Sequence, residues 1–226
     1  PTSVGKLHDI ESYHAHSMVF TRFDYSTGDA AGQNMVSRAT FIACEWINEQ
    51  RPEMLHYMLS GNFDTEKKTS SVNLLKTRGK RVTAEITVPR EILMKHLRVA
   101  PEQIAYGQQI STLSAILTNS SNNANHPANA LAALYLATGQ DVANIGESNQ
   151  CTTYQRATSK GDFYFSITLP AVIMATYGGG TALPTQRECL RMLGCEGKGK
   201  ALKLSEIAAA LVVAGELSLS GAARVD

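Results

Sequence analysis

A short polar stretch with two adjacent lysines is the part of this sequence best suited to chemistry. It runs from Ser60 to Lys68, contains Glu66-Lys67-Lys68 and is followed by Asn73. Paired ammonium groups can bind a carboxylate or polarise a carbonyl oxygen. A lysine assists a reaction only when it is held where negative charge develops, and holding it usually takes a carboxylate partner. Without such a partner, a solvated charged loop is the simpler interpretation.

Three other segments carry groups that chemistry could use. Asp141 follows a predicted helix in Gly139-Gln140-Asp141, where an aspartate alone is typically a turn former or a cap. Backbone amides in Gly28–Asn34 open a helix and could face a phosphate. The glycines of Gly178–Thr181 permit close backbone approach and positive φ. The Gly28–Asn34 segment lacks the spacing of a dinucleotide fingerprint or a P-loop, so an ordinary capped helix remains an open interpretation there. A flexible turn remains one for Gly178–Thr181.

Composition excludes several classes of function. The 226 residues have a formal net charge of +1 and 43% hydrophobic residues, which favours a folded core and gives no global field for nucleic acid. The four cysteines are irregularly spaced, which argues against a zinc site or a disulfide scaffold and favours reduced thiols in a cytoplasmic protein. His14-x-His16 lacks an evident third ligand, so no metal site is expected. No apolar run approaches the roughly 18 residues of a membrane span.

The elements expected to position these groups alternate between strands and helices. Alternating apolar side chains predict strands over 18–25, 54–59, 81–88 and 163–169. Apolar residues at helical spacing predict helices over 29–50, 89–97, 110–117, 127–137, 185–193 and 204–218. Asp29 is the expected N-cap of the first helix. The polar segment 61–79 is expected to be a long loop. This order predicts an α+β fold of two units joined near residues 58 to 70.

Taken together, the segments resemble the motifs of the hydroxymethylglutaryl-coenzyme A reductase family. In chain order they are Thr27-Gly28-Asp29-Ala30-Ala31-Gly32-Gln33-Asn34-Met35, Ser60–Lys68, Thr77-Arg78-Gly79-Lys80, Asn125-His126-Pro127-Ala128-Asn129, Gly139-Gln140-Asp141, Gly178–Thr181 and Ala214-Gly215-Glu216-Leu217-Ser218-Leu219. Their order and spacing match over essentially the whole chain, in the style of the class shared by eukaryotes and some bacteria. The resemblance implies a small ferredoxin-like cofactor-binding domain, partly present as residues 1–58. Part of a larger helix-rich α+β domain that binds substrate and coenzyme A follows as residues 59–226.

The resemblance also implies an activity and a set of site residues. The family reduces 3-hydroxy-3-methylglutaryl-coenzyme A to mevalonate with two hydrides from NADPH or NADH, in isoprenoid biosynthesis. By position, Lys67 would stabilise the developing oxyanion and Asp141 would orient it. The remaining implied contacts are Ser60 and Lys68 to the acyl carboxylate, Asp29, Asn34, Gly178, Gly179, Gly180 and Thr181 to the nicotinamide cofactor, and Arg98, His126 and Asn129 to coenzyme A or in support of the lysine. Family sites form between subunits, so a homodimer or homotetramer is expected.

Three departures from the family pattern qualify this expectation. The family's catalytic glutamate would fall before Pro1 and its catalytic histidine after Asp226. General acids contribute roughly 10²–10⁴-fold each, so this segment alone is expected to be very slow or inactive. Glu66 stands where the family has aspartate and Gln109 where a family lysine aligns, which leaves the acyl substrate open. The stretch 2–4, Thr-Ser-Val, lacks the arginine that contacts the cofactor 2′-phosphate, which leaves NADPH or NADH open.

Two hypotheses therefore follow from the sequence. In the first, the chain is the core of a reductase, which the retained Lys67 and Asp141 favour. In the second, it is a truncated, non-catalytic relative that binds nicotinamide nucleotide or coenzyme A without turnover. The first predicts oxidation of the nicotinamide cofactor with hydroxymethylglutaryl-coenzyme A, and the second predicts nucleotide binding alone.

Overall fold

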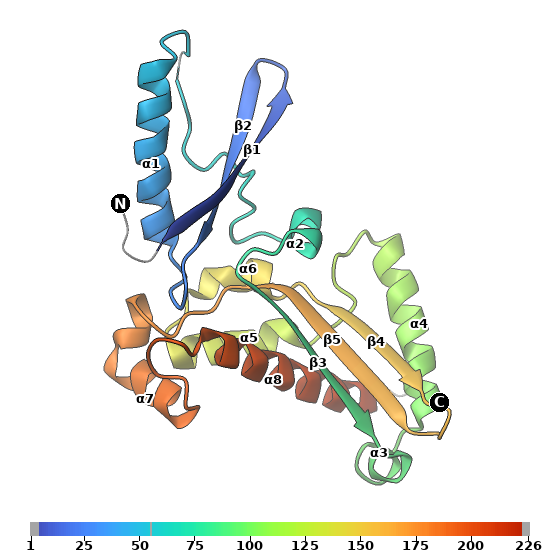
Figure 1. Cartoon of the computed structure of the whole chain (residues 1–226). Helices are drawn as coiled ribbons and strands as arrows, with labels where there is room; N and C mark the ends of the chain where they lie inside the picture. Colours follow the sequence, from blue (N-terminus) through green and yellow to red (C-terminus); the bar gives the residue numbers. More distant parts are fainter. Residues whose placement is uncertain (1–4, 55, 223–226) are drawn as a thin grey trace.

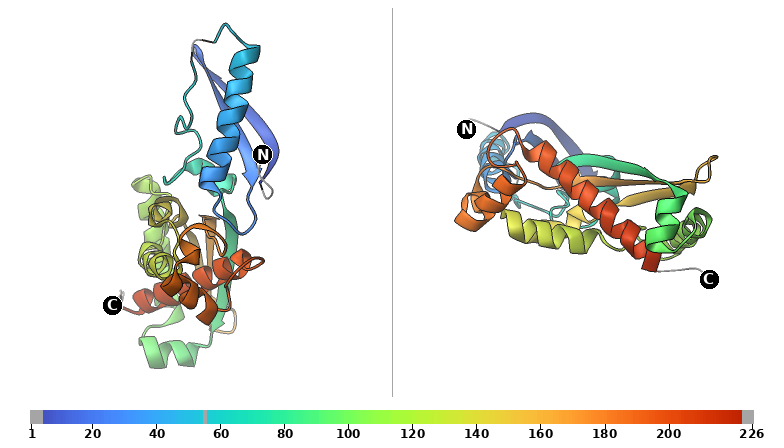
Figure 2. Two further views of the ribbon diagram at one scale, coloured as in Figure 1. Left: turned by 90° about the vertical axis from the view of Figure 1, so that its left-hand side faces the viewer. Right: turned by 90° about the horizontal axis from the view of Figure 1, so that it is seen from below.

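The N-terminal lobe is a two-stranded hairpin with one long helix beside it (Figure 1). The structure is a computed structural model and describes residues 5–54 and 56–222. Strands β1 (Lys6–Ala15) and β2 (Met18–Ser26) pair antiparallel, and helix α1 (Gln33–Gln50) follows. The lobe stands above the rest of the chain as a narrow extension, which Figure 2 shows from the side. Two strands and one helix are therefore the part of the expected small domain that the described residues contain.

Helix α1 has the predicted length and the predicted inner face, but it begins differently. The apolar face is half-buried, whereas Phe41, Ile42 and Trp46 on the other sides are exposed. The half-buried residues are Val36, Ala39, Thr40, Ala43, Cys44 and Ile47. The prediction that Asp29 caps this helix is wrong. The N-cap is Gly32, which has φ 78° and packs so closely on the Thr27 side chain that a Cβ would clash there.

The second lobe is built on a three-stranded antiparallel sheet in the order β3-β5-β4. Its strands are β3 (Lys80–Val88), β4 (Thr152–Ala157) and β5 (Phe163–Val172). Side chains of β5 alternate, with Phe163, Phe165 and Ile167 fully buried and Tyr164 and Ser166 half-buried. An antiparallel sheet with one covered face has this alternation.

Helices cover the buried face of this sheet and close its ends. Helix α8 (Ala201–Ala222) packs across β3 and β5, and α5 (Pro127–Thr138) packs on α8, as Figure 2 shows from below. Helix α4 (Pro101–Leu117) lies along β4. The others are α2 (Ser71–Leu75), α3 (Arg90–Leu97), α6 (Ile145–Ser148) and α7 (Pro184–Met192). The α+β class expected from the sequence is confirmed.

Several local expectations differ from the structure. No strand forms among the described residues of 54–59, where Met54, Met58 and Leu59 are exposed, so that apolar run has no face to bury. The segment 61–79 is not all loop, because Ser70 accepts a hydrogen bond from Val72 N (3.1 Å) and caps α2. Strands β1 and β4 lack strong apolar alternation and were not predicted.

Candidate functional site

The loop from Ser60 to Lys68, here called the reactive loop, has an unusual backbone. Ser60, Asn62, Thr65 and Lys67 all have positive φ, between 57° and 66°. Left-handed geometry costs a non-glycine residue roughly 1–2 kcal/mol, so other contacts must impose it. The buried Asn73 supplies two of these contacts. It accepts from Thr65 Oγ1 (2.7 Å) and donates to the carbonyl oxygen of residue 68 (3.2 Å).

Lys67 and Asp141, which the sequence singled out separately, meet in space. The Lys67 Nζ lies 3.2 Å from Asp141 Oδ2 and 3.6 Å from Glu66 Oε1. The hydrogen bond to Asp141 raises the pKa of Lys67 above its usual value. Burial alone would raise the pKa of Asp141, but the Ala143 N–H and the Lys67 ammonium outweigh it and lower that pKa. Both groups are therefore charged at neutral pH.

The end of α5 fixes the position of Asp141. Gly139 ends this helix with φ 71°, and Asp141 then caps a 3-10 turn over Val142–Asn144 by accepting from Ala143 N (3.1 Å) through Oδ1. Its other oxygen faces Lys67. One carboxylate thus holds its own backbone turn and the lysine.

The same helix end lies against the glycine-rich turn. A Cβ on Gly180 would lie 2.5 Å from the Gly139 carbonyl oxygen, so the two backbones touch only because both residues are glycine. Gln140 adds a second connection, since its side chain accepts from Ala175 N (2.7 Å) and donates to Ala175 O (2.8 Å). The structure therefore brings Gly178–Thr181 next to the turn that carries Asp141.

The glycine turn has an open outer surface. Gly178 and Gly179 are exposed, have positive φ and would meet nothing within 4 Å at a Cβ position. Thr181 is buried and donates through Oγ1 to Gly178 O (2.7 Å), which closes the turn. Open glycines over a closed turn provide a surface that a flat or phosphorylated ligand can approach closely.

Asp29, expected as a cofactor contact, makes structural contacts that the sequence did not indicate. Its carboxylate accepts from the backbone N–H groups of Gly199 (2.7 Å) and Ala201 (3.1 Å) at the start of α8. The Gly199 hydrogen bond lowers the pKa of Asp29 below its usual value. Its carbonyl oxygen accepts from Thr176 N (2.9 Å), close to the glycine turn. Asn34, by contrast, lies exposed on the first turn of α1.

The two expected acyl-group contacts lie on the surface of the reactive loop. Ser60 donates through Oγ to Asp64 Oδ2 (2.6 Å), and Lys68 Nζ donates to the carbonyl oxygen of Glu66 (3.1 Å). Both side chains belong to exposed residues, so a ligand can replace these contacts.

Arg98, His126 and Asn129 lie away from Lys67 within the chain. Arg98 ends α3, at the opposite end of β3 from the reactive loop (Figure 1). His126 caps the start of α5 and Asn129 is in its first turn, whereas Asp141 follows its end. A helical rise of 1.5 Å per residue puts the two ends of α5 about 20 Å apart. Within one chain, these three residues therefore do not join the group around Lys67.

The sequence did not assign a role to several residues around Lys67. Gln33 Nε2 donates to Glu66 Oε1 (2.9 Å) and to Asn144 Oδ1 (3.0 Å) and so connects α1 to the site. Glu147 and Arg78 form an ion pair beneath the loop. Gln33 and Arg78 stand inside the quoted motifs, which was the available signal, whereas nothing in the sequence pattern marked Glu147.

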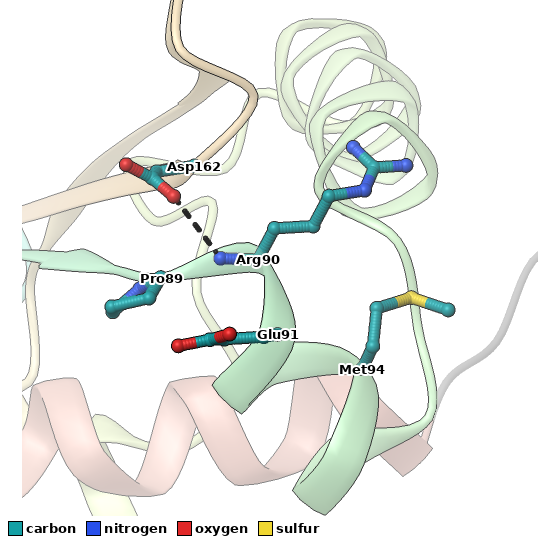
Figure 3. Close-up of a pocket in the computed structure, with 5 residues that line it drawn as sticks. All are labelled: Pro89, Arg90, Glu91, Met94 and Asp162. Carbon is teal, nitrogen blue, oxygen red and sulfur yellow. Dashed lines mark hydrogen bonds between the residues drawn. The ribbon is translucent and has the colours of Figure 1, made fainter.

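Other parts of the described chain offer little for chemistry. A shallow hollow beside the start of α3 is lined by Pro89, Arg90, Glu91, Met94 and Asp162, and Figure 3 shows its main polar contact, Arg90 N to Asp162 Oδ1 (3.1 Å). It lies beside α3, at the far end of β3 from α2 (Figure 1). Within residues 5–54 and 56–222, no group of three or more His, Cys, Asp or Glu could hold a metal ion. In the same ranges, no helix has the length and apolar character needed to cross a membrane. Position 4, where the family's arginine for the cofactor 2′-phosphate is missing, lies outside the described residues.

Comparison with known proteins gives consistent matches. The family model described as hydroxymethylglutaryl-coenzyme A reductase matches residues 1–226. The chain is 42% identical to the 3-hydroxy-3-methylglutaryl-coenzyme A reductase of Pyrococcus abyssi and 44% identical to that of Methanothermobacter thermautotrophicus, over 98% of this chain and 56% of each relative. It is 39% identical to reductase 2 of Dictyostelium discoideum, over 96% of this chain and 43% of the relative. The chain thus spans about half the length of these relatives.

A solved structure is similar in fold. It is the class II 3-hydroxy-3-methylglutaryl-CoA reductase from Streptococcus pneumoniae bound to NADPH in open conformations. The TM-score is 0.70 at 19% sequence identity, with 96% of this chain and 59% of that chain covered. The likeness shows a shared fold.

Proposed function

Because the chain belongs to the hydroxymethylglutaryl-coenzyme A reductase family, we propose that its protein reduces 3-hydroxy-3-methylglutaryl-coenzyme A to mevalonate. The observation that supports this most is the Lys67–Asp141 pair, 3.2 Å apart, with side chains 41% and 37% exposed. The lysine is held in place and can still reach a ligand. When hydride adds to a carbonyl carbon, negative charge appears on the oxygen, and a fixed ammonium group stabilises that charge.

The direction of the Lys67 pKa fits a role as a cation. A lysine acts as a nucleophile or a base when its pKa is depressed, because it must lose its proton. Asp141 does the opposite and raises the pKa of Lys67. Lys67 is therefore proposed to act as a cation, and Asp141 is proposed to direct it.

The glycine turn and α1 are the proposed nucleotide contacts. Gly178 and Gly179 offer open backbone, and Asn34 offers an exposed amide on the neighbouring lobe. A bound NADPH or NADH would supply the hydride. The solved relative from Streptococcus pneumoniae binds NADPH, which makes NADPH the first nucleotide to test. Gly180, Thr181 and Asp29 are proposed to shape this surface, with Thr181 and Asp29 already engaged in the hydrogen bonds described above. The division into a cofactor-binding unit, 1–58, and a substrate-binding unit, 59–226, is part of the same proposal.

The substrate is proposed to bridge two copies of the chain. Ser60 and Lys68 belong to the reactive loop that carries Lys67, whereas Arg98, His126 and Asn129 lie away from it. A homodimer or homotetramer would let one chain complete the site of another. Exposed apolar side chains on α4 fit such contacts, namely Tyr106, Ile110, Leu113, Ile116 and Leu117. The four free cysteines fit the proposed cytoplasmic location.

The direct test is oxidation of NADPH or NADH, followed at 340 nm, when hydroxymethylglutaryl-coenzyme A is added to the purified protein. The proposal expects two nucleotides oxidised for each mevalonate formed. Tight nucleotide binding with no oxidation under any condition would instead support the non-catalytic binding relative. Light scattering on the same sample measures the oligomer, and a monomer that turns over substrate would exclude shared sites.

A further inference from the structure

A buried carboxylate that the proposed reaction does not use lies directly beneath Lys67. Glu147 is fully buried, on α6. Its Oε1 accepts the backbone N–H of Lys67 (3.2 Å) and also the guanidinium of Arg78. Its Oε2 has no hydrogen-bond partner among the described residues. Burying a carboxylate is costly, so one that binds the backbone of the reactive lysine calls for a reason.

The neighbouring glycine contacts the backbone of Lys67 on the other side of its Cα, at the carbonyl group. A Cβ on Gly146 would lie 2.5 Å from the Lys67 carbonyl oxygen, so the two backbones are in direct contact. Glu147 thus binds the N–H of Lys67, and Gly146 packs against its carbonyl group. Between these groups Lys67 has φ 61°, a conformation that it would not keep without support.

The acid that orients the ammonium belongs to the same short segment. Asp141 caps the 3-10 turn over Val142–Asn144, and α6 continues directly from it to Ser148. Asp141 contacts Nζ and Glu147 contacts the backbone N–H of one lysine, from positions six residues apart. Since the 3-10 turn and α6 are continuous, the two contacts are set at a fixed spacing.

We infer that Glu147 is a positioning residue, which with Gly146 holds the Lys67 backbone so that its ammonium lies against Asp141. The contacts stand by themselves, and only the effect on turnover rests on the proposed function. The guanidinium of Arg78 pairs with Glu147 and so offsets its buried negative charge. The Nη2 atom of Arg78 also lies 4.0 Å from Glu66 Oε2. Burial raises the pKa of Glu147 and Arg78 opposes that rise. A merely structural Glu147 would anchor Arg78 and have no effect on the Lys67 ammonium.

The test measures Lys67 itself. Lysines are acylated competitively with trace acetic anhydride across a pH series, and mass spectrometry compares Lys67 with the exposed Lys95 on α3. Only the neutral amine reacts, so loss of the Asp141 contact makes Lys67 react faster at a given pH. In Glu147→Gln we expect acylation of Lys67 at pH 9 to rise roughly threefold or more, because a weaker contact with Asp141 leaves more of the amine neutral. Lys95 should not change.

Matched variants separate positioning from general loss of structure. Glu216→Gln removes another buried carboxylate that binds backbone N–H groups, those of residues 125 and 126, and it should leave the Lys67 profile as in wild type. Gly146→Ala presses on the Lys67 carbonyl from the other side and should speed acylation of Lys67 in the same way. It also serves if Glu147→Gln does not fold.

The outcomes are distinct. An unchanged Lys67 profile in a folded Glu147→Gln or Gly146→Ala variant, or an equal change in Glu216→Gln, would overturn the inference. In the turnover assay, Glu147→Gln should lower kcat about tenfold or more and leave the KM for the nucleotide nearly unchanged, because the lysine acts in the transition state. If the protein reduces no thioester, the acylation result still decides whether Glu147 positions Lys67, so the two proposals fail separately.

Discussion

Replacing Asp29 should loosen the start of α8 and the connection between the two lobes. The carboxylate accepts two backbone hydrogen bonds there, from Gly199 (2.7 Å) and Ala201 (3.1 Å). Removing a carboxylate cap of this kind costs about 0.5–2 kcal/mol. We expect Asp29→Ala to lower the free energy of unfolding by about 2 kcal/mol. Asp29→Asn keeps one acceptor oxygen and should lose about half of that.

Thermal denaturation without any ligand measures this effect. For a chain of this size, 1 kcal/mol corresponds to roughly 2–4 °C in Tm, so Asp29→Ala should melt about 4–8 °C lower. Asp9→Ala removes an exposed aspartate on β1 and should change the free energy of unfolding by less than about 0.5 kcal/mol. An Asp29→Ala variant with the Tm of wild type would refute the structural role and leave only a cofactor contact.

The pH dependence provides a second check on Asp29. Its pKa is lowered in the folded state, so the folded chain binds fewer protons there than the unfolded chain. The stabilisation is present above the ordinary carboxyl pKa and is lost as the pH falls through the lowered value. The Tm difference between wild type and Asp29→Ala should therefore be constant from pH 7 to about 5 and shrink in stronger acid. A difference that grows on acidification contradicts this assignment.

Three further changes test the packing around the site. Gly139→Ala forces a Cβ into the Gly180 carbonyl group at φ 71° and should lower the free energy of unfolding by about 2 kcal/mol or more. It should also weaken NADPH binding in a fluorescence titration. Unchanged affinity would show that the two turns need not touch. Asn73→Ala removes a buried amide that fixes the reactive loop, and should cost about 1–3 kcal/mol and speed amide hydrogen exchange in that loop, with unchanged protection as the contrary result. Asp141→Asn removes the group that raises the pKa of Lys67, so competitive acylation of Lys67 should become faster at pH 9; an unchanged rate would mean that the 3.2 Å contact carries no charge coupling.

Strong periodicity predicted the fold where side-chain burial decides structure. β3, β5 and α1 appear as expected because their apolar side chains alternate or recur at helical spacing and meet a partner surface. β1 fails this rule because it is mostly charged and polar and is held by backbone pairing with β2. The run 54–59 fails in the opposite way, since it is apolar but has no strand to pair with among the described residues. Tertiary pairing is not encoded in either segment alone.

Some residues of the site could likewise be predicted from the sequence and others could not. Lys67 and Asp141 were identifiable through motifs, and the structure brings them together. Glu147 was not identifiable, because its role depends on a fold that places α6 under a loop 80 residues earlier in the chain. Asp29 lay within a quoted motif, yet its partner is the start of α8, 170 residues away. A motif identifies the type of residue, whereas the partner of that residue is known only from the folded structure.

Lys67 is proposed to stabilise the negative charge that develops during hydride transfer. The most direct measurement compares kcat and nucleotide Kd for wild type, Lys67→Ala and the control Lys95→Ala, with NADPH and hydroxymethylglutaryl-coenzyme A. Loss of one fixed donor to an oxyanion typically lowers kcat roughly 10²–10³-fold, so Lys67→Ala should lose at least that much while Lys95→Ala does not. The nucleotide Kd should be the same in all three proteins. A Lys67→Ala protein that retains wild-type kcat would show that Lys67 does not stabilise this charge.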